Sequence, residues 1–514
     1  MFRIILLGLL TTALLASEAP VQYQLTLTDP ATDRFEVELV PAPIESDEAV
    51  FQMATSAPGT YQVHDWGRFV VELQALDADG NALSVTRDGD NRWQIADATR
   101  LARVSYVVDD TFDADHGGKP IWPMAGTNVE DDNIVINPFG IFGYISGQEG
   151  LAMDVGIRMP DEWGLATVLP ITHGDDGVYR VHADNYHHLA DSPMLGGNVI
   201  SHSVQIDDCE VIIAVNGNTT AYSKEALIDT FVPVVEAARD WLGGIPTDRY
   251  AFLLHVRPGM TFMVGALEHR QSSLYHLPPQ LDSRMLQTVG THEFFHVVTP
   301  LNVHSEVIAS FDYAKPRAPS HLWLYEGVTE YAAHMILRRA NLTTDQRLLR
   351  NLRQKFIADA MMHDKGISLI ELSEGTLDKT NHLYLNVYER GALTALALDL
   401  ELLRLSDGTY GLRQLIHDLI ERFGPERPFA KDELFTVLEE LSGQPMAAWC
   451  ERYIAGPERP DYTALLETVG WSYQPMVKGE RGVEIHVLEE LDEPTPAQLA
   501  RRAAWLGLPL PAEE

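Results

Sequence analysis

The stretch Thr291-His292-Glu293-Phe294-Phe295-His296 contains a His-Glu-x-x-His pattern, and it decides how the rest of the chain is interpreted. On a helix, side chains at positions i and i+4 share a face, so His292 and His296 can bring two imidazole nitrogens to one metal ion. Glu293 follows directly and can reach a water molecule at that metal. Zinc suits such a site, because imidazole binds it well and it polarises a carbonyl without redox chemistry. The alternative is two partly buried histidines on an amphipathic face.

The residues around this motif favour a helix. Asp282 and Ser283 are capping residue types at its expected start. Apolar residues then recur at helical spacing, namely Leu286, Val289, Phe294 and Val297. Pro300 ends the pattern, because proline disfavours the helical conformation of the residue before it. We therefore expect His292 and His296 in the last two turns of a largely buried helix.

A catalytic zinc ion needs a third protein ligand, and the segment 320–331 offers one. Ser320 can cap a helix that runs towards Arg339, with Glu326 and Glu330 at positions i and i+4 of one face. This spacing lets Glu326 bind the metal while Glu330 accepts the N–H of a ligating histidine. The alternative is a solvated acidic stripe. It is less attractive because apolar residues surround most of this helix, where an unpaired carboxylate would be costly.

Two further motifs contain side chains suited to an active site. Gly265-Ala266-Leu267-Glu268-His269 follows an apolar, strand-like run, and a glutamate at the end of a strand can hold a cation. Tyr388-Glu389-Arg390-Gly391-Ala392-Leu393 opens a strongly apolar helix that runs to about Leu403. A tyrosine hydroxyl near a metal can donate to a developing oxyanion. Tyr388 is the expected donor, and Tyr384, one turn earlier, is the alternative.

The order of these motifs resembles that of the glycyl aminopeptidase family of zinc peptidases. The shared motifs are Gly-Ala-Leu-Glu-His at 265–269, His-Glu-x-x-His at 292–296, Leu-Trp-x-x-Glu-Gly-x-Thr at 322–329 and Tyr-x-Arg-Gly-Ala-Leu at 388–393. The similarity extends into the N-terminal half, for example through Ala57-Pro58-Gly59-Thr60-Tyr61, and covers about residues 20 to 470. The family has a thermolysin-like catalytic domain and is distantly related to the large aminopeptidases that include leukotriene A4 hydrolase.

The resemblance implies a zinc aminopeptidase with one Zn²⁺ per chain. His292, His296 and Glu326 would bind the metal, and Glu330 would orient a ligating histidine. Glu293 would take a proton from the attacking water and return it to the leaving amine. Tyr388 would stabilise the oxyanion.

The resemblance also implies how substrates are chosen. Glu268 would hold the free α-ammonium group of a peptide, in a substrate-binding segment that includes Gly265 and Ala266. The best-known members of the family favour small N-terminal residues, so glycine or alanine is expected first in the peptide. Two alternatives stay open. One is a zinc endopeptidase or non-peptide hydrolase of the same fold, and the other is a non-catalytic peptide-binding relative.

The expected fold class is multidomain α+β. Alternating apolar residues and Gly- or Asp-rich turns predict an N-terminal β-sandwich-like domain at 18–215. Helical patterns dominate beyond it and predict the thermolysin-like, mostly helical catalytic domain at 216–472. The rest, 473–514, is expected to be an acidic C-terminal tail with a short helix near 496–506. Many members of the family continue into a C-terminal PDZ domain, for which the residues after Gly470 are too few.

Composition narrows the location and the partners. A charged Met1-Phe2-Arg3 start, an apolar run and small residues predict a signal peptide at 1–17 and a periplasmic or secreted protein. No later segment is long and apolar enough to span a membrane. The net charge of −36 argues against nucleic acid and anionic membranes as partners. Peptides with a free N-terminus are the expected partners, and the oligomeric state is left open. Cys209 and Cys450 can pair after export or remain independent thiols.

Overall fold

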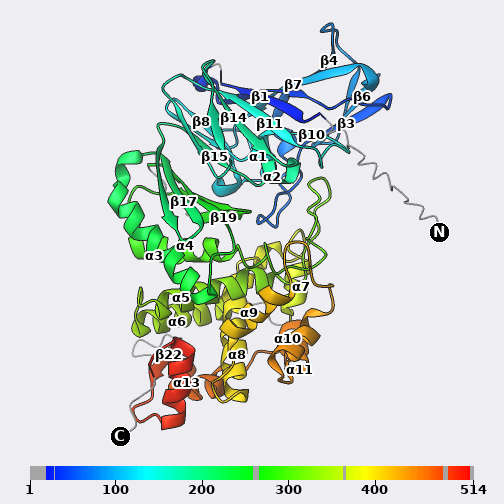
Figure 1. Ribbon diagram of the computed structural model, residues 1–514. Helices are drawn as coiled ribbons and strands as arrows, with labels where there is room; N and C mark the ends of the chain where they lie inside the picture. The colour runs from blue at the N-terminus through cyan, green and yellow to red at the C-terminus, as the bar shows by residue number, and fades with distance from the viewer. Residues whose placement is uncertain (1–18, 28, 259–264, 363–365, 479–483, 510–514) are drawn as a thin grey trace, which may run out of the picture.

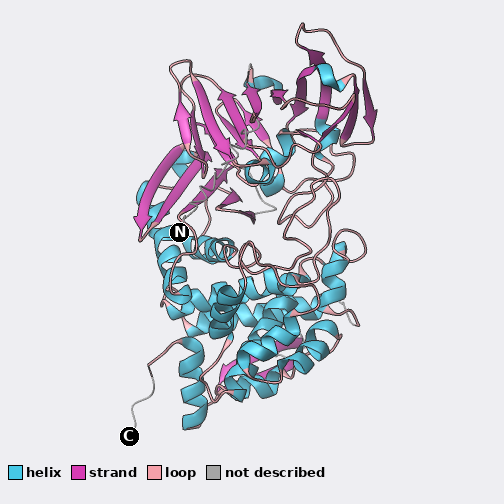
Figure 2. Cartoon of the chain, turned by 45° about the vertical axis from the view of Figure 1, so that its right-hand side comes forward, coloured by secondary structure: helices cyan, strands magenta, loops and turns pink. Residues whose placement is uncertain are grey.

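The chain folds into two stacked halves, seen in a computed structural model that describes residues 19–27, 29–258, 265–362, 366–478 and 484–509 (Figure 1). The expected signal peptide at 1–17 lies outside the described residues. The β-rich half comprises residues 19–199, and the helical half comprises residues 200–509. Strands dominate the upper half and helices the lower half (Figure 2), which confirms the predicted multidomain α+β class.

Three sheets form the β-rich half. The largest has the strand order β13 (Ile171–His173), β14 (Val178–Ala183), β11 (Met153–Arg158), β1 (Val21–Thr26), β2 (Arg34–Val40), β7 (Leu101–Asp109) and β4 (Val70–Asp77). The second has the order β10 (Tyr144–Ile145), β3 (Glu48–Gln52), β6 (Arg92–Ala96) and β5 (Val85–Asp88). The third has the order β12 (Gly164–Thr167), β15 (Met194–Gly197), β9 (Asn133–Ile136) and β8 (Asn128–Glu130).

Alternation of buried and exposed residues explains how the largest sheet packs. In β2, Phe35, Val37 and Leu39 are buried while their neighbours along the strand are exposed. Successive side chains of a strand point to opposite faces, so one face of the large sheet enters the core and the other meets solvent. Phe51 of the second sheet reaches the same core, where its ring centroid lies 4.9 Å from that of Tyr106 in β7.

A fourth sheet belongs to the helical half and corrects the expected domain boundary. Its strand order is β16 (Ile200–Ile206), β17 (Cys209–Gly217), β18 (Arg249–Val256), β20 (Ser272–Leu277) and β19 (Gly265–His269). The boundary expected at residue 215 would cut through β17, which pairs in parallel with β18. The change between the halves therefore lies near residue 199. Pairing with a strand about forty residues later in the chain decides this, and local sequence patterns do not reveal it.

Both faces of this fourth sheet are covered, which explains its nearly continuous apolar strands. Ile213 and Phe252 pack into the main helical core with Phe231 of α3 (Lys224–Leu242). Alternate residues of the same strands, such as Ile212 and Leu253, form a small cluster with side chains of the third sheet. The sheet thus joins the two halves, and its edge strand β19 lies where they meet.

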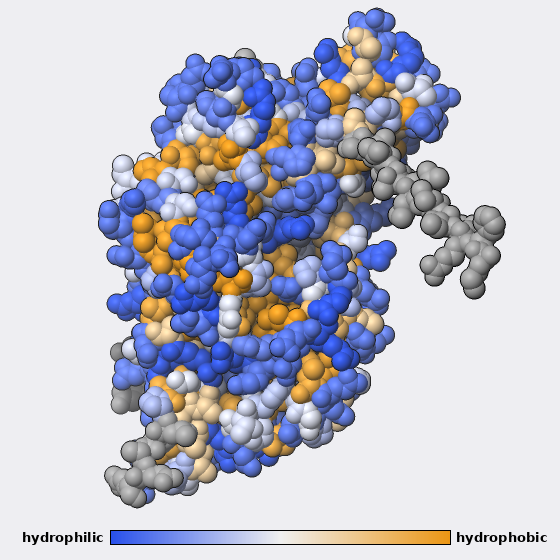
Figure 3. Space-filling model, in the orientation of Figure 1, coloured by the Kyte–Doolittle hydropathy of each residue, from blue (hydrophilic) through white to orange (hydrophobic). Residues whose placement is uncertain are grey.

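Helices make up most of the rest of the helical half. They are α4 (Ser283–Phe295), α5 (Thr329–Arg339), α6 (Asp345–Met361), α7 (Leu369–Glu374), α8 (Asn386–Leu405), α9 (Leu412–Arg422), α10 (Leu434–Ser442), α11 (Met446–Cys450) and α12 (Tyr462–Glu467). Within the described ranges, no helix combines the length and hydropathy needed to cross a bilayer. The face in Figure 3 is mostly hydrophilic, in keeping with the strongly negative net charge. Cys209 and Cys450 are both buried and unpaired.

The C-terminal segment is packed against the helices, so the expectation of a tail at 473–514 is wrong. β21 (Trp471–Lys478) and β22 (Glu484–Glu490) form a hairpin, and α13 (Pro496–Leu506) follows at the bounds expected for the short helix. Trp505 is fully buried, and its indole N–H donates to the Tyr331 hydroxyl at 2.6 Å. Its ring meets Trp471 edge to face. Burial of two tryptophans outweighs the acidic composition that suggested a solvated tail.

Candidate metal centre

Helix α4 presents the His-Glu-x-x-His motif from its last turn. The helix begins where expected, because the Asp282 carboxylate caps it by accepting from the backbone N–H of Arg284. His292 and Glu293 lie in the final turn, and His296 is the C-terminal capping residue. All three are buried. The Tyr250 hydroxyl on β18 donates to the carbonyl oxygen of Glu293, and this hydrogen bond ties the last turn of α4 to the fourth sheet.

Glu326 comes from a π-helical segment, Trp323–Val328, that continues directly into α5. Wider helical turns of this kind occur frequently at functional sites. The expected cap by Ser320 is wrong, because its hydroxyl donates to Glu374 and the helix starts only after His321. Glu326 is almost completely buried. The π-helical segment therefore turns a carboxylate inward at a point where the helix is otherwise apolar.

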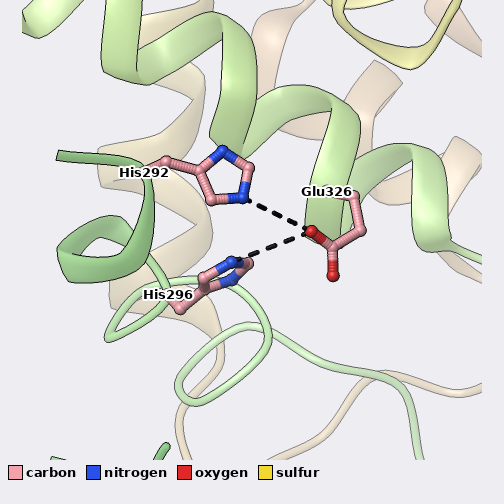
Figure 4. Close-up of side chains that lie close together, drawn as sticks. All are labelled: His292, His296 and Glu326. Atoms are coloured by element: carbon pink, nitrogen blue, oxygen red, sulfur yellow. Dashed lines mark ion pairs between the residues drawn. The ribbon is translucent and has the colours of Figure 1, made fainter. Parts of the chain in front are cut away.

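The two histidines and Glu326 converge on one point (Figure 4). Glu326 Oε2 lies 3.5 Å from His292 Nε2 and 3.8 Å from His296 Nε2, and one ligand atom from each residue lies within 4.8 Å of the others. His292 Nδ1 donates to Glu330 Oε2 at 2.8 Å, and His296 Nδ1 donates to the Thr299 carbonyl oxygen at 2.8 Å. Since the Nδ1 atoms are engaged in these hydrogen bonds, the two Nε2 atoms are the ones that face Glu326 and would bind a metal.

The residues present fit a zinc ion. Both carboxylate oxygens of Glu326 are buried and have no hydrogen-bond partner within the described part of the chain. A buried carboxylate that accepts no hydrogen bond is costly, and a cation placed between it and the two Nε2 atoms would remove that cost. Two imidazole nitrogens and one carboxylate are also the protein ligands of many catalytic zinc sites.

Burial and charge shift the pKa values of the two histidines in opposite directions. Burial lowers the pKa of His296 to about 4, so this ring is neutral at neutral pH. Burial also lowers the pKa of His292, but the nearby carboxylates Glu326 and Glu330 outweigh burial and hold it well above its usual value. Without a cation in the site this ring therefore carries a proton on Nε2, which a metal ion would replace. The carboxylate Glu330 keeps a pKa well below its usual value despite burial, mainly because of Lys355. An ionised Glu330 is the acceptor that orients His292.

Two more buried carboxylates lie beside the centre. Glu293 and Glu268 each place an oxygen within 4.8 Å of the other and of a His296 ring nitrogen. Burial raises the pKa of Glu293 to about 8, and nearby Glu326 adds to the rise. Burial likewise raises the pKa of Glu268, with Glu326 and Glu293 adding to it. Cations in the site would lower both pKa values again, since opposite charges favour the ionised form.

Glu268 lies on β19, and a loop of the β-rich half covers it. One Glu268 oxygen is buried without a hydrogen-bond partner among the described residues. The backbone of Gly59, with φ +74°, passes so close that a Cβ atom there would lie 2.6 Å from the carboxylate. Ala266 shares the face of Glu268 on this strand, while Gly265 faces the opposite side, where Met124 fills the space of a side chain. Of the expected substrate-binding segment, Glu268 thus lies at the centre and Gly265 lies away from it.

The structure brings both candidate oxyanion donors to the centre. The Tyr384 and Tyr388 hydroxyls are hydrogen-bonded to each other at 2.8 Å, and the Tyr388 ring centroid lies 5.8 Å from that of His292. Burial raises the pKa of both phenols well above the usual value, and the charge of Glu326 reinforces this. Both groups therefore keep their protons and can donate them in hydrogen bonds.

Two glycines allow the π-helical segment with Glu326 and helix α8 with Tyr388 to touch. Gly327 follows Glu326, and Gly391 lies one turn after Tyr388 in α8. A Cβ atom at Gly327 would lie 2.5 Å from the Cα of Gly391, and one at Gly391 would lie 2.8 Å from the Cα of Gly327. The two backbones touch here, which fixes Tyr388 relative to Glu326.

Sequence reasoning assigned no role to two aromatic residues of the β-rich half near the centre. The ring centroids of Tyr61 and Trp122 lie 6.1 and 5.8 Å from that of Tyr384. Tyr61 adopts φ +45°, a conformation that non-glycine residues rarely take and that often marks functional sites. The Ala-Pro-Gly-Thr-Tyr motif was the available signal for Tyr61. For Trp122 the sequence offered none, because only the contact between the halves brings it here.

A cavity of about 690 Å³ lies between the halves beside the centre. Gly59 and Tyr61 line it from the β-rich half, and Val297, Pro300 and His304 line it from the segment that follows His296. This volume is in the range of pockets that bury small ligands or a few residues of a peptide. Asp191, also in its wall, binds the buried His269 next to Glu268 at 2.9 Å.

Comparison with known proteins covers both halves. Residues 22–198 match the model of the Peptidase M61 N-terminal domain, and residues 285–394 match that of M61 glycyl aminopeptidase, which together is more than half of the chain. No curated protein matches its sequence.

Solved structures show the same fold at low identity. An aminopeptidase N family protein from Idiomarina loihiensis has a TM-score of 0.80 and 22% identity, over 90% of this chain and 81% of that one. A variant of an M1 zinc metallopeptidase from Deinococcus radiodurans, bound to a Tyr-Ser-Ala substrate, has a TM-score of 0.54 and 14% identity, over 86% and 95%. Native yeast LTA4 hydrolase has a TM-score of 0.54 and 14% identity, over 88% and 71%.

Proposed function

The chain belongs to the M61 glycyl aminopeptidase family and is a metallopeptidase, and on this premise we propose that it is a zinc aminopeptidase. It would remove small N-terminal residues, glycine or alanine, from peptides. The observation that carries the proposal is the convergence of two Nε2 atoms on the buried carboxylate of Glu326, which accepts no hydrogen bond from the described residues. His292, His296 and Glu326 would hold one Zn²⁺, with Glu330 orienting His292.

The chain's own side chains supply the proton transfers. Bound zinc would act as a Lewis acid that polarises the scissile carbonyl and makes water a better nucleophile at neutral pH. The Glu293 carboxylate would accept a proton from the attacking water and pass it to the leaving amine nitrogen. The hydroxyl of Tyr388 would donate to the carbonyl oxygen as negative charge develops there.

Glu268 would make the enzyme an exopeptidase. Its buried carboxylate would pair with the α-ammonium group of the substrate, and the Gly59 backbone, which passes close to this carboxylate, would limit the room for further peptide on that side. The remaining residues of the peptide would lie in the cavity beside His296. The solved relative with a bound Tyr-Ser-Ala substrate supports a peptide as the ligand class.

The main test replaces Glu293 with glutamine, which keeps the shape of the side chain but removes the proton acceptor. We expect zinc content to stay near one equivalent while hydrolysis of alanyl and glycyl arylamides is nearly abolished. A variant that keeps zinc and near-normal turnover would rule out the mechanism. Zinc far below one equivalent in the parent protein would favour the non-catalytic peptide-binding alternative.

A second test separates the aminopeptidase from the other hydrolases. Acetylating the N-terminus of a peptide removes the ammonium group, so we expect at least a hundredfold lower kcat/KM for the acetylated form. Equal cleavage of both forms would favour an endopeptidase or a non-peptide hydrolase. In a panel of aminoacyl arylamides, a clear preference for leucine or arginine would contradict the small-residue proposal.

We also propose export to the periplasm or the medium, on the basis of the sequence at 1–17. N-terminal sequencing of the protein from its native cells should find a start near residue 18. An intact Met1 in mature protein would contradict export through cleavage at this site.

A further inference from the structure

A buried lysine lies behind the candidate metal centre. Lys355 is on α6, and only 7% of its side chain is exposed. Its ammonium group donates to Glu330 Oε1 at 2.6 Å and to Glu389 Oε2 at 3.5 Å. A buried lysine is rare and costly unless carboxylates compensate it, and here two do.

The first carboxylate leads directly to a metal ligand. Glu330 uses one oxygen to hold the N–H of His292 and the other to bind Lys355 and, at 3.4 Å, His334 Nε2. Lys355 is the one lysine or arginine that pairs with Glu330 among the described residues. The ammonium group therefore fixes the carboxylate that fixes the ring of His292.

The second carboxylate leads to the oxyanion donor. Glu389 follows Tyr388 in the first turn of α8. Lys355 thus contacts Glu330 on α5, the helix that continues from the Glu326 segment, and Glu389 on α8, the helix that carries Tyr388. Without its charge, two carboxylates would face the same buried space and repel each other.

We propose that Lys355 is a positioning residue with two contacts. It holds Glu330 against His292, and it holds the first turn of α8, with Tyr388, close to α5. This rests on the proposed zinc centre. Outer groups that orient metal ligands typically change metal affinity 10- to 100-fold when they are removed. Lys355 acts one residue further out, through Glu330, and we expect an effect near the lower end of that range.

The first experiment measures the zinc dissociation constant by competition with a chromophoric chelator. Lys355→Met keeps most of the length and removes the charge, and we expect about tenfold weaker zinc binding. Lys355→Arg keeps the charge and should recover most of the affinity. The control is Lys431→Met, which removes an exposed lysine paired with Glu374 and should leave affinity unchanged. Unchanged affinity in Lys355→Met would overturn the proposal.

A double-mutant cycle tests the route through Glu330. If Lys355 acts through this carboxylate, Lys355→Met should have little further effect on zinc affinity in a Glu330→Gln background. Independent effects would instead multiply to within about twofold, and that outcome would overturn the proposal. Lys355→Gln provides a second neutral variant if the methionine variant does not fold.

The arm through Glu389 predicts a different signature. Glu389→Gln should lower kcat several-fold with little change in zinc affinity or KM, because it loosens Tyr388 and leaves Glu330 in place. A drop in zinc affinity as large as that of Lys355→Met would refute this separation. If the parent protein itself bound no zinc, the proposed function would fail. Tight zinc binding that is indifferent to Lys355 would refute this inference alone.

Discussion

Replacing Tyr388 with phenylalanine removes one hydroxyl and tests which tyrosine stabilises the oxyanion. A donor aimed at the developing negative charge forms its best hydrogen bond in the transition state, so its loss lowers kcat more than it raises KM. Loss of one such donor in other oxyanion holes reduces turnover by about 10²–10³. We expect a loss of this size for Tyr388→Phe, because its ring lies 5.8 Å from that of His292.

The neighbouring tyrosine sets the scale for a merely supporting hydroxyl. Tyr384 contacts the Tyr388 hydroxyl at 2.8 Å and would steady it without touching the substrate. A neutral hydrogen bond contributes about 0.5–1.5 kcal/mol, which corresponds to about a 2- to 12-fold change in rate. Tyr384→Phe should therefore reduce kcat by about tenfold at most.

The assay is steady-state hydrolysis of an alanyl arylamide by both single variants and the double variant. Zinc content and melting temperature serve as controls, since both substitutions keep the ring and its packing. In the double variant, the Tyr384 substitution should add little, because the hydroxyl that it steadies is already gone. A nearly silent Tyr388→Phe together with a hundredfold loss in Tyr384→Phe would refute our assignment and make Tyr384 the donor.

Three other predictions address the surroundings of the centre. Gly59→Ala should raise KM for peptides at least tenfold. The added Cβ atom would lie 2.6 Å from the Glu268 carboxylate, and Gly59 has a positive φ that alanine rarely adopts. An unchanged KM would contradict the role of Glu268. Removing metal with a chelator should lower the melting temperature by several degrees, and adding zinc should restore it. A free zinc concentration about a thousandfold above Kd stabilises the folded state by about 4 kcal/mol. An unchanged melting curve would argue against a metal here. Trp505→Phe removes the hydrogen bond to Tyr331 and should lower the free energy of unfolding in urea by about 1–3 kcal/mol with normal kcat/KM, whereas lost activity at unchanged stability would contradict a structural role.

The helix that carries His292, Glu293 and His296 was predictable because its information is local. The spacing of His292, Glu293 and His296 places them on adjoining helix faces wherever the helix lies. The same holds for Glu326 and Glu330, although the sequence did not reveal the π-helical segment that turns Glu326 inward. The class of the fold followed from the change in periodicity between the two halves.

Groups that reach the centre through tertiary contacts were not predictable in this way. Tyr61 and Trp122 approach Tyr384 only because the two halves pack together. Lys355 lies on a helix that also carries the exposed Arg350 and Arg353, so nothing in the local sequence singles it out, and only its burial distinguishes it. The C-terminal segment was wrongly expected to be a tail because of its acidic residues. The burial of Trp505, which anchors α13, could not be inferred from that composition.

The backbone contact between Gly327 and Gly391 separates two tasks of the molecule. Because the two main chains touch without side chains between them, different rotamers cannot change the spacing of the helices. The distance between Glu326 and Tyr388 is therefore set by the backbone. The surroundings of Glu268, where the first residue of a substrate would bind, include instead the Gly59 loop of the β-rich half, whose sequence can change without moving these helices. Differences in substrate choice within this fold should therefore lie in loops such as this one. The geometry of the groups that would cleave the bond should stay the same, because the helix contact sets it.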